Sequence, residues 1–120
     1  MIGTYEYILF TNDTSFLVGI HSKYLIAMSF ITSKIDNTGM LDVTGVSDWG
    51  RLSQGGHNTE ANMLLYKTLT TGSRIATWHG DTASANSWSD LAATLKKAVN
   101  ANNYDLSAGY IFRLSYQAYC

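Results

Sequence analysis

The sequence predicts an all-α protein built from antiparallel helical hairpins. Apolar residues recur at intervals of three and four over three long segments, as they do on the buried face of a helix. Proline is absent from the 120 residues, and no tight turn joins two alternating segments, which argues against an all-β domain. Short connections rich in Asp, Asn, Thr and Gly separate the helical segments. We therefore expect successive helices to run in opposite directions.

The three predicted helices lie near residues 14–35, 59–76 and 83–101. Gly39 is expected to stop the first helix, because glycine adopts a positive φ without strain. Residues 1–10 fit either an apolar helix or a strand over so short a length. The predicted inward faces are formed by Leu17, Ile20, Tyr24, Met28, Ile31 and Ile35, by Ala61, Leu64, Leu65, Thr68, Leu69, Gly72, Ile75 and Ala76, and by Ala85, Trp88, Leu91, Ala92, Leu95 and Val99.

Turn residues with capping side chains precede each predicted helix. Residues 11–14 form such a turn before the first helix. Asn58 or Thr59 is expected to cap the second helix, and Asp81 or Thr82 the third. Residues 105–120 show no clear period and predict an irregular tail. Residues 1–120 are accordingly expected to form a single domain.

Composition limits the partners of the chain. Charged residues make up only 14% and the net charge is −1, which excludes a disordered tail and argues against nucleic acid as a partner. The low charge and many aromatic residues favour a protein partner that contacts exposed apolar helix faces. No apolar run approaches the ~20 residues of a membrane span, so no membrane partner is expected. The N-terminus has no basic region followed by a cleavage site, hence no signal peptide is expected and the localisation stays undetermined.

No metal and no cofactor are expected. Cys120 is the only cysteine, so neither an intrachain disulfide nor a thiolate metal site can form. The sequence contains no glycine-rich phosphate loop, no HExxH pair and no nucleophile elbow.

The residues suited to ligand binding are concentrated between Gly45 and Asn62, in the string GVSDWGRLSQGGHNTEAN. A sugar ring binds to a flat apolar face and to polar groups that reach its hydroxyls. The aromatic, charged and amide side chains of this string offer both. The structural alternative is a loop in which the Asp and Arg side chains pair with each other and the Trp indole packs in a neighbouring groove. In that alternative the His and Asn side chains cap a helix. The candidate sugar-binding residues are Asp48, Trp49, Arg51, His57 and Asn58.

With these motifs placed, the chain resembles a known family. SDWGR followed by GGHNTEAN, then a helix ending in GD and another reading LAATLKKAVNANNYD, resembles the catalytic domain of α-L-rhamnosidase-like glycoside hydrolases, six-hairpin glycosidases common in fungi. The resemblance runs from about Asn12 to Asp105. It implies that the chain is a fragment of an (α/α)6 barrel that hydrolyses terminal α-L-rhamnosides. By resemblance, Trp49 lines the sugar subsite, and Asp48 and Arg51 support or contact the sugar.

The resemblance also implies an incomplete active site. The acid segment of the family precedes this region, its base comes from a later hairpin, and neither has a counterpart here. Glycosidases need two carboxylates ~5 to 9.5 Å apart, and the central string offers Asp48 and Glu60. Glu60 is a weak catalytic candidate, because a carboxylate in the first turn of a helix is commonly a cap. We expect the chain to be inactive alone, the alternative being a non-catalytic helical interaction module or a carbohydrate-binding module.

Overall fold

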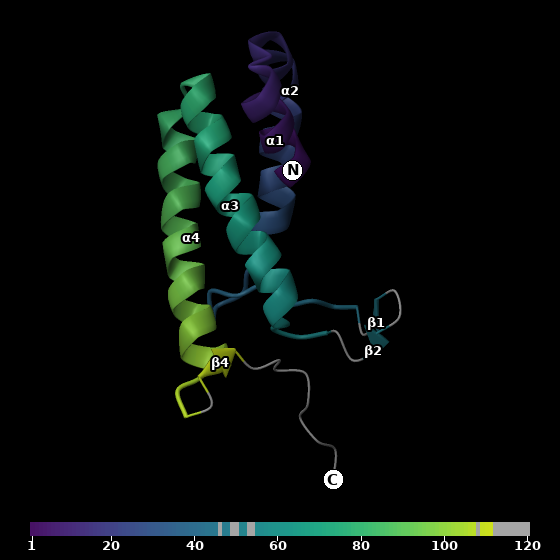
Figure 1. Cartoon of the computed structure of the whole chain (residues 1–120), viewed down its shortest axis with the longest axis vertical. Helices are drawn as coiled ribbons and strands as arrows, with labels where there is room; N and C mark the ends of the chain where they lie inside the picture. The colour runs from purple at the N-terminus through teal and green to yellow at the C-terminus, as the bar shows by residue number, and fades with distance from the viewer. Residues whose placement is uncertain (46, 49–50, 53–54, 108, 112–120) are drawn as a thin grey trace.

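The computed structural model describes residues 1–45, 47–48, 51–52, 55–107 and 109–111. The predicted all-α class is confirmed for these residues, which are mainly helical. Two helical hairpins lie side by side along a common long axis (Figure 1). Their helices are α1 (Ile2–Thr11), α2 (Thr14–Thr32), α3 (Thr59–His79) and α4 (Thr82–Asn103).

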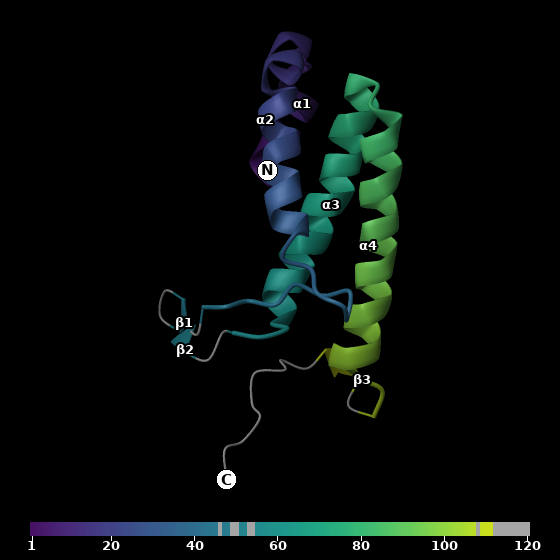
Figure 2. The same ribbon diagram turned by 180° about the vertical axis from the view of Figure 1, so that it is seen from behind.

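Each hairpin closes through a tight turn with the same local chemistry. Asn12 ends α1 in the left-handed region at φ 52°, and Asp13 caps α2 by accepting a 2.8 Å hydrogen bond from the Phe16 N–H. Gly80 ends α3 at φ 87°, and the Asp81 carboxylate accepts from the Ser84 N–H at 3.0 Å. Both turns lie at the upper end of the molecule in Figures 1 and 2. The loops and the end of α4 lie at the other end.

α3 is the helix on which the others converge. It packs along α4 and also contacts α1 and α2. At Gly72 the approach is so close that an added Cβ would lie 2.9 Å from Met28 Cε and 3.3 Å from Trp88 Cε3. A larger residue at this position would require the end of the Met28 side chain, and slightly the Trp88 ring, to shift. The buried core comprises Tyr5, Ile8, Leu17, Tyr24, Met28, Met40, Leu65, Leu69, Ile75, Ala76, Ala85, Trp88, Ala92, Leu95 and Val99.

The helix bounds differ from those predicted by the periodicity where the chain reverses direction. α2 ends at Thr32, because Ile35 forms an isolated β-bridge with Leu41 and draws the chain away from the helix axis. Gly39, expected as the stop, has its positive φ of 79° in the turn that follows. Residues 1–10, left open between helix and strand, lie mainly in α1. Leu64, predicted to face inward, is 61% exposed, and Leu65 next to it fills the core.

Two short antiparallel ribbons accompany the helices. β1 (Ser47–Asp48) pairs with β2 (Arg51–Leu52) inside the connection between α2 and α3. β3 (Tyr104–Asp105) directly follows α4 and pairs with β4 (Tyr110–Ile111). The tail for which the sequence predicts irregular structure therefore begins with a ribbon. Residues 112–120 lie outside the described part of the chain.

α2 is long and apolar enough to cross a membrane by length and composition alone, so the expectation that no apolar run approaches the length of a span is wrong for this helix. Its 18-residue window has a mean hydropathy of 1.3, and 22% of that window is buried. One such helix near the N-terminus is weak evidence for a membrane protein, since core helices of soluble proteins and signal sequences meet the same criteria.

Candidate functional site

The connection between α2 and α3 carries the predicted sugar-binding residues. Asp48 lies in β1 and Arg51 in β2, and their Cα atoms are partners in the ladder. Trp49, between them in sequence, lies outside the described residues. The ribbon extends sideways from the lower end of α3 (Figure 1).

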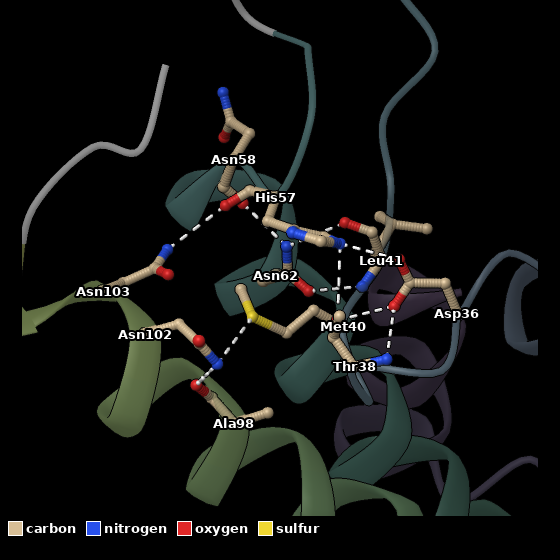
Figure 3. A network of polar contacts seen from close by, with 10 residues as sticks. All are labelled: Asp36, Thr38, Met40, Leu41, His57, Asn58, Asn62, Ala98, Asn102 and Asn103. Atoms are coloured by element: carbon tan, nitrogen blue, oxygen red, sulfur yellow. Dashed lines mark hydrogen bonds and ion pairs between the residues drawn. The ribbon is translucent and has the colours of Figure 1, made fainter. Parts of the chain in front are cut away.

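His57 closes the connection at its base. Its Nε2 atom lies 2.8 Å from Asp36 Oδ2 and 3.3 Å from Thr38 Oγ1. The other Asp36 oxygen accepts from the N–H and the hydroxyl of Thr38 at 2.8 and 2.5 Å. Figure 3 shows these three side chains meeting on one side of the network. The imidazole therefore ties the start of the connection to its end.

The same contacts determine the ionisation of Asp36. The hydrogen bonds from the Thr38 hydroxyl, from His57 and from the Thr38 N–H lower the pKa of this carboxyl to about 2. Each of these donors stabilises the carboxylate form. Asp36 is consequently ionised at neutral pH and cannot act there as a general acid, which needs a raised pKa.

Asn58 directly precedes α3 as its N-cap, and Glu60 lies in the first turn of the helix. The buried Asn58 accepts from the Ala61 N–H at 3.1 Å and so caps the helix, one of the two capping residues predicted. This contact occupies the side-chain oxygen of a predicted sugar-binding residue. Glu60 is exposed in the first turn of α3, where the positive end of the helix dipole favours a carboxylate.

Two asparagines that the sequence analysis did not single out hold this region together. Asn62 is fully buried and bonds both backbone polar groups of Leu41, and its Nδ2 atom also donates to the Asn58 carbonyl at 2.9 Å. Asn103 Nδ2, at the end of α4, donates to the His57 carbonyl at 3.2 Å and to Thr59 Oγ1 at 2.7 Å. Figure 3 shows how the two amides link the connection to α3 and α4.

A sequence signal for Asn62 existed. It lies between Ala61 and Leu65 in a helix whose neighbouring positions are apolar, and an amide in such a place must find partners when it is buried. Asn103 carried a weaker signal, because it ends a run of polar residues that reads simply as a helix terminus. Its Oδ1 atom is buried and has no hydrogen-bond partner among the described residues.

The described hydrogen bonds of Asp36, His57, Asn62 and Asn103 hold the connection between α2 and α3 against the helices. Within the described ranges, no group of three or more His, Cys, Asp or Glu side chains is arranged to hold a metal ion. No protein-family model matches the chain, and no curated protein matches it in sequence.

Proposed function

We propose that the chain contributes two helical hairpins to a glycoside hydrolase domain of the α-L-rhamnosidase-like type. In this proposal it supplies one wall of a sugar site and is inactive alone. The main support is the connection between α2 and α3, whose base is held by the Asp36–His57 contact and the Asn62 amide. A rigid base allows a loop to present ligand-binding side chains in a defined place.

The ribbon supports a sugar as the ligand. Asp48 and Arg51 pair across β1 and β2, and Trp49 follows Asp48 in the chain. A carboxylate and a guanidinium on one short ribbon provide acceptors and donors for adjacent hydroxyls, and an indole provides the apolar face. Polar groups together with an aromatic ring are common at sites for neutral ligands.

In this function the chain supplies no pair of catalytic carboxyl groups. Hydrolysis of a glycoside needs one carboxyl with a raised pKa and a second carboxylate ~5 to 9.5 Å away. Asp36 has its pKa lowered to about 2 and is committed to His57. Glu60 remains the weak candidate, in the first turn of α3, where a carboxylate is commonly part of a cap.

Two assays on the purified chain test this proposal. In the first, an aryl α-L-rhamnoside is incubated with the wild-type chain and with Glu60→Gln, and we expect no turnover from either. In the second, rhamnose is titrated into chains that all carry Trp78→Ala, so that the signal of this exposed indole is removed. Tryptophan fluorescence is followed, and Trp49→Ala is compared with the buried-site control Trp88→Phe. Saturable binding lost only in Trp49→Ala supports the sugar wall. Turnover abolished by Glu60→Gln contradicts the inactive state, and binding that persists in Trp49→Ala contradicts the assignment of the ribbon.

A second candidate function is that of a non-catalytic helical module that binds another protein. The supporting observation is an apolar surface on α1 and α2, where Phe10 is 85%, Ile26 72% and Phe30 67% exposed. Large exposed apolar patches mark interaction sites. Sedimentation and binding of a hydrophobic dye test this candidate, with Ile26→Ser as the variant. A dye-silent monomer argues against it, whereas dye binding or self-association that Ile26→Ser reduces supports it.

A further inference from the structure

A cavity of about 330 Å³ lies at the opposite end of the molecule from the ribbon. It is formed where the turn between α1 and α2 meets the last residues of α3. This volume is at the lower end of the range of small-molecule sites, ~300 to 1,000 Å³. The lining residues are Ile8, Leu9, Asn12, Thr14, Leu17 and Trp78.

One wall of the cavity is the Trp78 indole, which stacks on another aromatic ring. Trp78 is 43% exposed and stacks on Tyr5, with ring centroids 5.3 Å apart and planes within 7° of parallel. The buried Tyr5 is itself fixed by Arg74, whose Nη1 atom donates to the phenol oxygen at 2.8 Å. The exposed indole is thus positioned before any ligand arrives. Preorganisation of this kind reduces the entropy lost on binding.

The polar part of the lining is uncharged. Within the described part of the chain, no hydrogen bond is formed by the side-chain amide of Asn12 or by the hydroxyl of Thr14. The neighbouring Asp13 carboxylate is already occupied by the Tyr7 hydroxyl at 3.1 Å and the Phe16 N–H at 2.8 Å. A ligand here would therefore meet one amide and one hydroxyl, each able to donate and accept.

From this combination we infer a second binding site, for a neutral hydroxylated ring such as a pyranose. The apolar face of the ring stacks on Trp78, and its hydroxyls bond Asn12 and Thr14. The site is independent of the proposed sugar-facing ribbon, because it uses other residues at the other end of the helices. An apolar floor of Ile8 and Leu17 completes it.

The test is a titration of the full chain with methyl α-L-rhamnopyranoside and methyl α-D-glucopyranoside, followed by ¹H–¹⁵N spectra of the Trp indole and Asn side-chain groups. We expect saturable shifts of the Trp78 and Asn12 signals with at least one glycoside. Trp78→Ala should weaken binding roughly tenfold or more through loss of stacking. Asn12→Gly keeps the left-handed backbone and removes the amide, and Thr14→Val removes the hydroxyl at similar volume. Each should weaken binding about three- to tenfold.

Two controls separate the possible outcomes. Trp49→Ala should leave these shifts unchanged, so that failure of the ribbon proposal and failure of this one are distinguishable. Trp78→Phe retains a stacking ring and should bind at intermediate strength, which keeps the test valid if Trp78→Ala does not fold. The inference is overturned if neither glycoside shifts Trp78 and Asn12, or if Trp78→Ala binds as the wild type does.

Discussion

The side-chain amide of Asn62 pairs with Leu41 as a second strand would. The Leu41 N–H donates to Asn62 Oδ1 at 2.7 Å, and Asn62 Nδ2 donates to the Leu41 carbonyl at 3.1 Å. A helix side chain thereby satisfies both polar groups of a backbone segment that runs beside the helix. The contact anchors the connection that carries the ribbon.

Replacement of Asn62 by alanine should therefore destabilise the protein. The change leaves both Leu41 groups and the Asn58 carbonyl without this partner, and we expect the free energy of unfolding to fall by about 3 kcal/mol. Asn102→Ala is the matched control, since Asn102 is exposed and its Nδ2 atom donates to the Ala98 carbonyl within its own helix. That change should stay within about 0.5 kcal/mol. Urea unfolding measures both, and equal losses would contradict the anchoring role of Asn62.

Two helical glycines should respond to alanine in opposite directions. A Cβ on Gly72 would lie 2.9 Å from Met28 Cε and 3.3 Å from Trp88 Cε3, whereas a Cβ on Gly19 meets nothing within 4 Å. Gly19→Ala should stabilise the protein by about 0.5 to 1 kcal/mol through helix propensity. Gly72→Ala gains the same term but overpacks the core, at a cost of about 1 to 3 kcal/mol. Thermal unfolding should place Gly19→Ala above the wild type and Gly72→Ala below it.

The Asp36–His57 contact should control opening of the connection. Val43 and Gly56 exchange two backbone hydrogen bonds of 3.0 and 2.9 Å at the base of the connection. In His57→Gln these two amides should exchange with solvent faster, while amides in the middle of α4 keep their wild-type rates. Hydrogen exchange followed by NMR measures this. Unchanged protection at Val43 and Gly56 would show that the imidazole does not hold the connection closed.

The ionisation of Asp36 gives a separate prediction. Its pKa in the folded protein, about 2, lies below the ordinary value of 3.8 because of the bonds from Thr38 and His57. A lowered carboxyl pKa adds stability that is fully present above 3.8 and is lost as the pH falls through the folded pKa. Carboxyl NMR titration should find Asp36 near 2 in the wild type and higher in Thr38→Val. An Asp36 pKa close to 3.8 in the wild type would contradict the described contacts.

The pair of imidazoles formed by His21 and His79 should make the free energy of unfolding depend on pH near neutrality. The His21 and His79 rings have centroids 3.5 Å apart, and His21 Nε2 lies 3.5 Å from Asp81 Oδ2. Burial, and then repulsion from His79, lower the pKa of His21 below its ordinary 6.5, against an opposing effect of Asp81. The unfolded chain therefore binds more protons as the pH falls from 6.5 through the folded pKa, and stability is lost over that interval.

Removal of His79 isolates this effect. In His79→Gln the decrease in the free energy of unfolding between about pH 7.5 and 5 should be smaller than in the wild type, because one source of repulsion is gone. Asp81 does not obscure the result, since its pKa is lowered from 3.8 and its own contribution is lost only at more acidic pH. A decrease of equal size in both proteins would contradict the role of His79.

Much of the helical architecture could be predicted because its signals are local. Asn58 and Asp81, each named as one of two capping candidates, accept from N–H groups three residues ahead. α3 extends to His79, three residues beyond the predicted end at residue 76, and Gly80 ends it with a positive φ. The inward face of α4 follows from a period that any helix must obey, since residues three and four apart share one side. The exposure of Leu64 shows the limit of this reasoning, because the width of the buried stripe depends on the partner helices.

The candidate site could be predicted only in part. Its residue types were visible in one short string, within which Asp48 and Arg51 are backbone partners in a two-stranded ladder. The roles of His57 and Asn58 were open between ligand binding and structural support, and the hydrogen bonds described above for both are structural. His57 contacts Asp36, a residue that was not among the candidate site residues predicted from the sequence.

The sequence by itself determined the three long helices and narrowed the N-terminal caps of the second and third to two candidates each, because these depend on side chains within about one turn of each other. Only the tertiary structure decided what holds the long connection. Leu41 and Asn62 are 21 residues apart, as are Asp36 and His57, and Asn103 lies 46 residues from His57. No period relates such positions, and their contacts form because packing of α3 against its neighbours brings buried polar groups to partners that they must find.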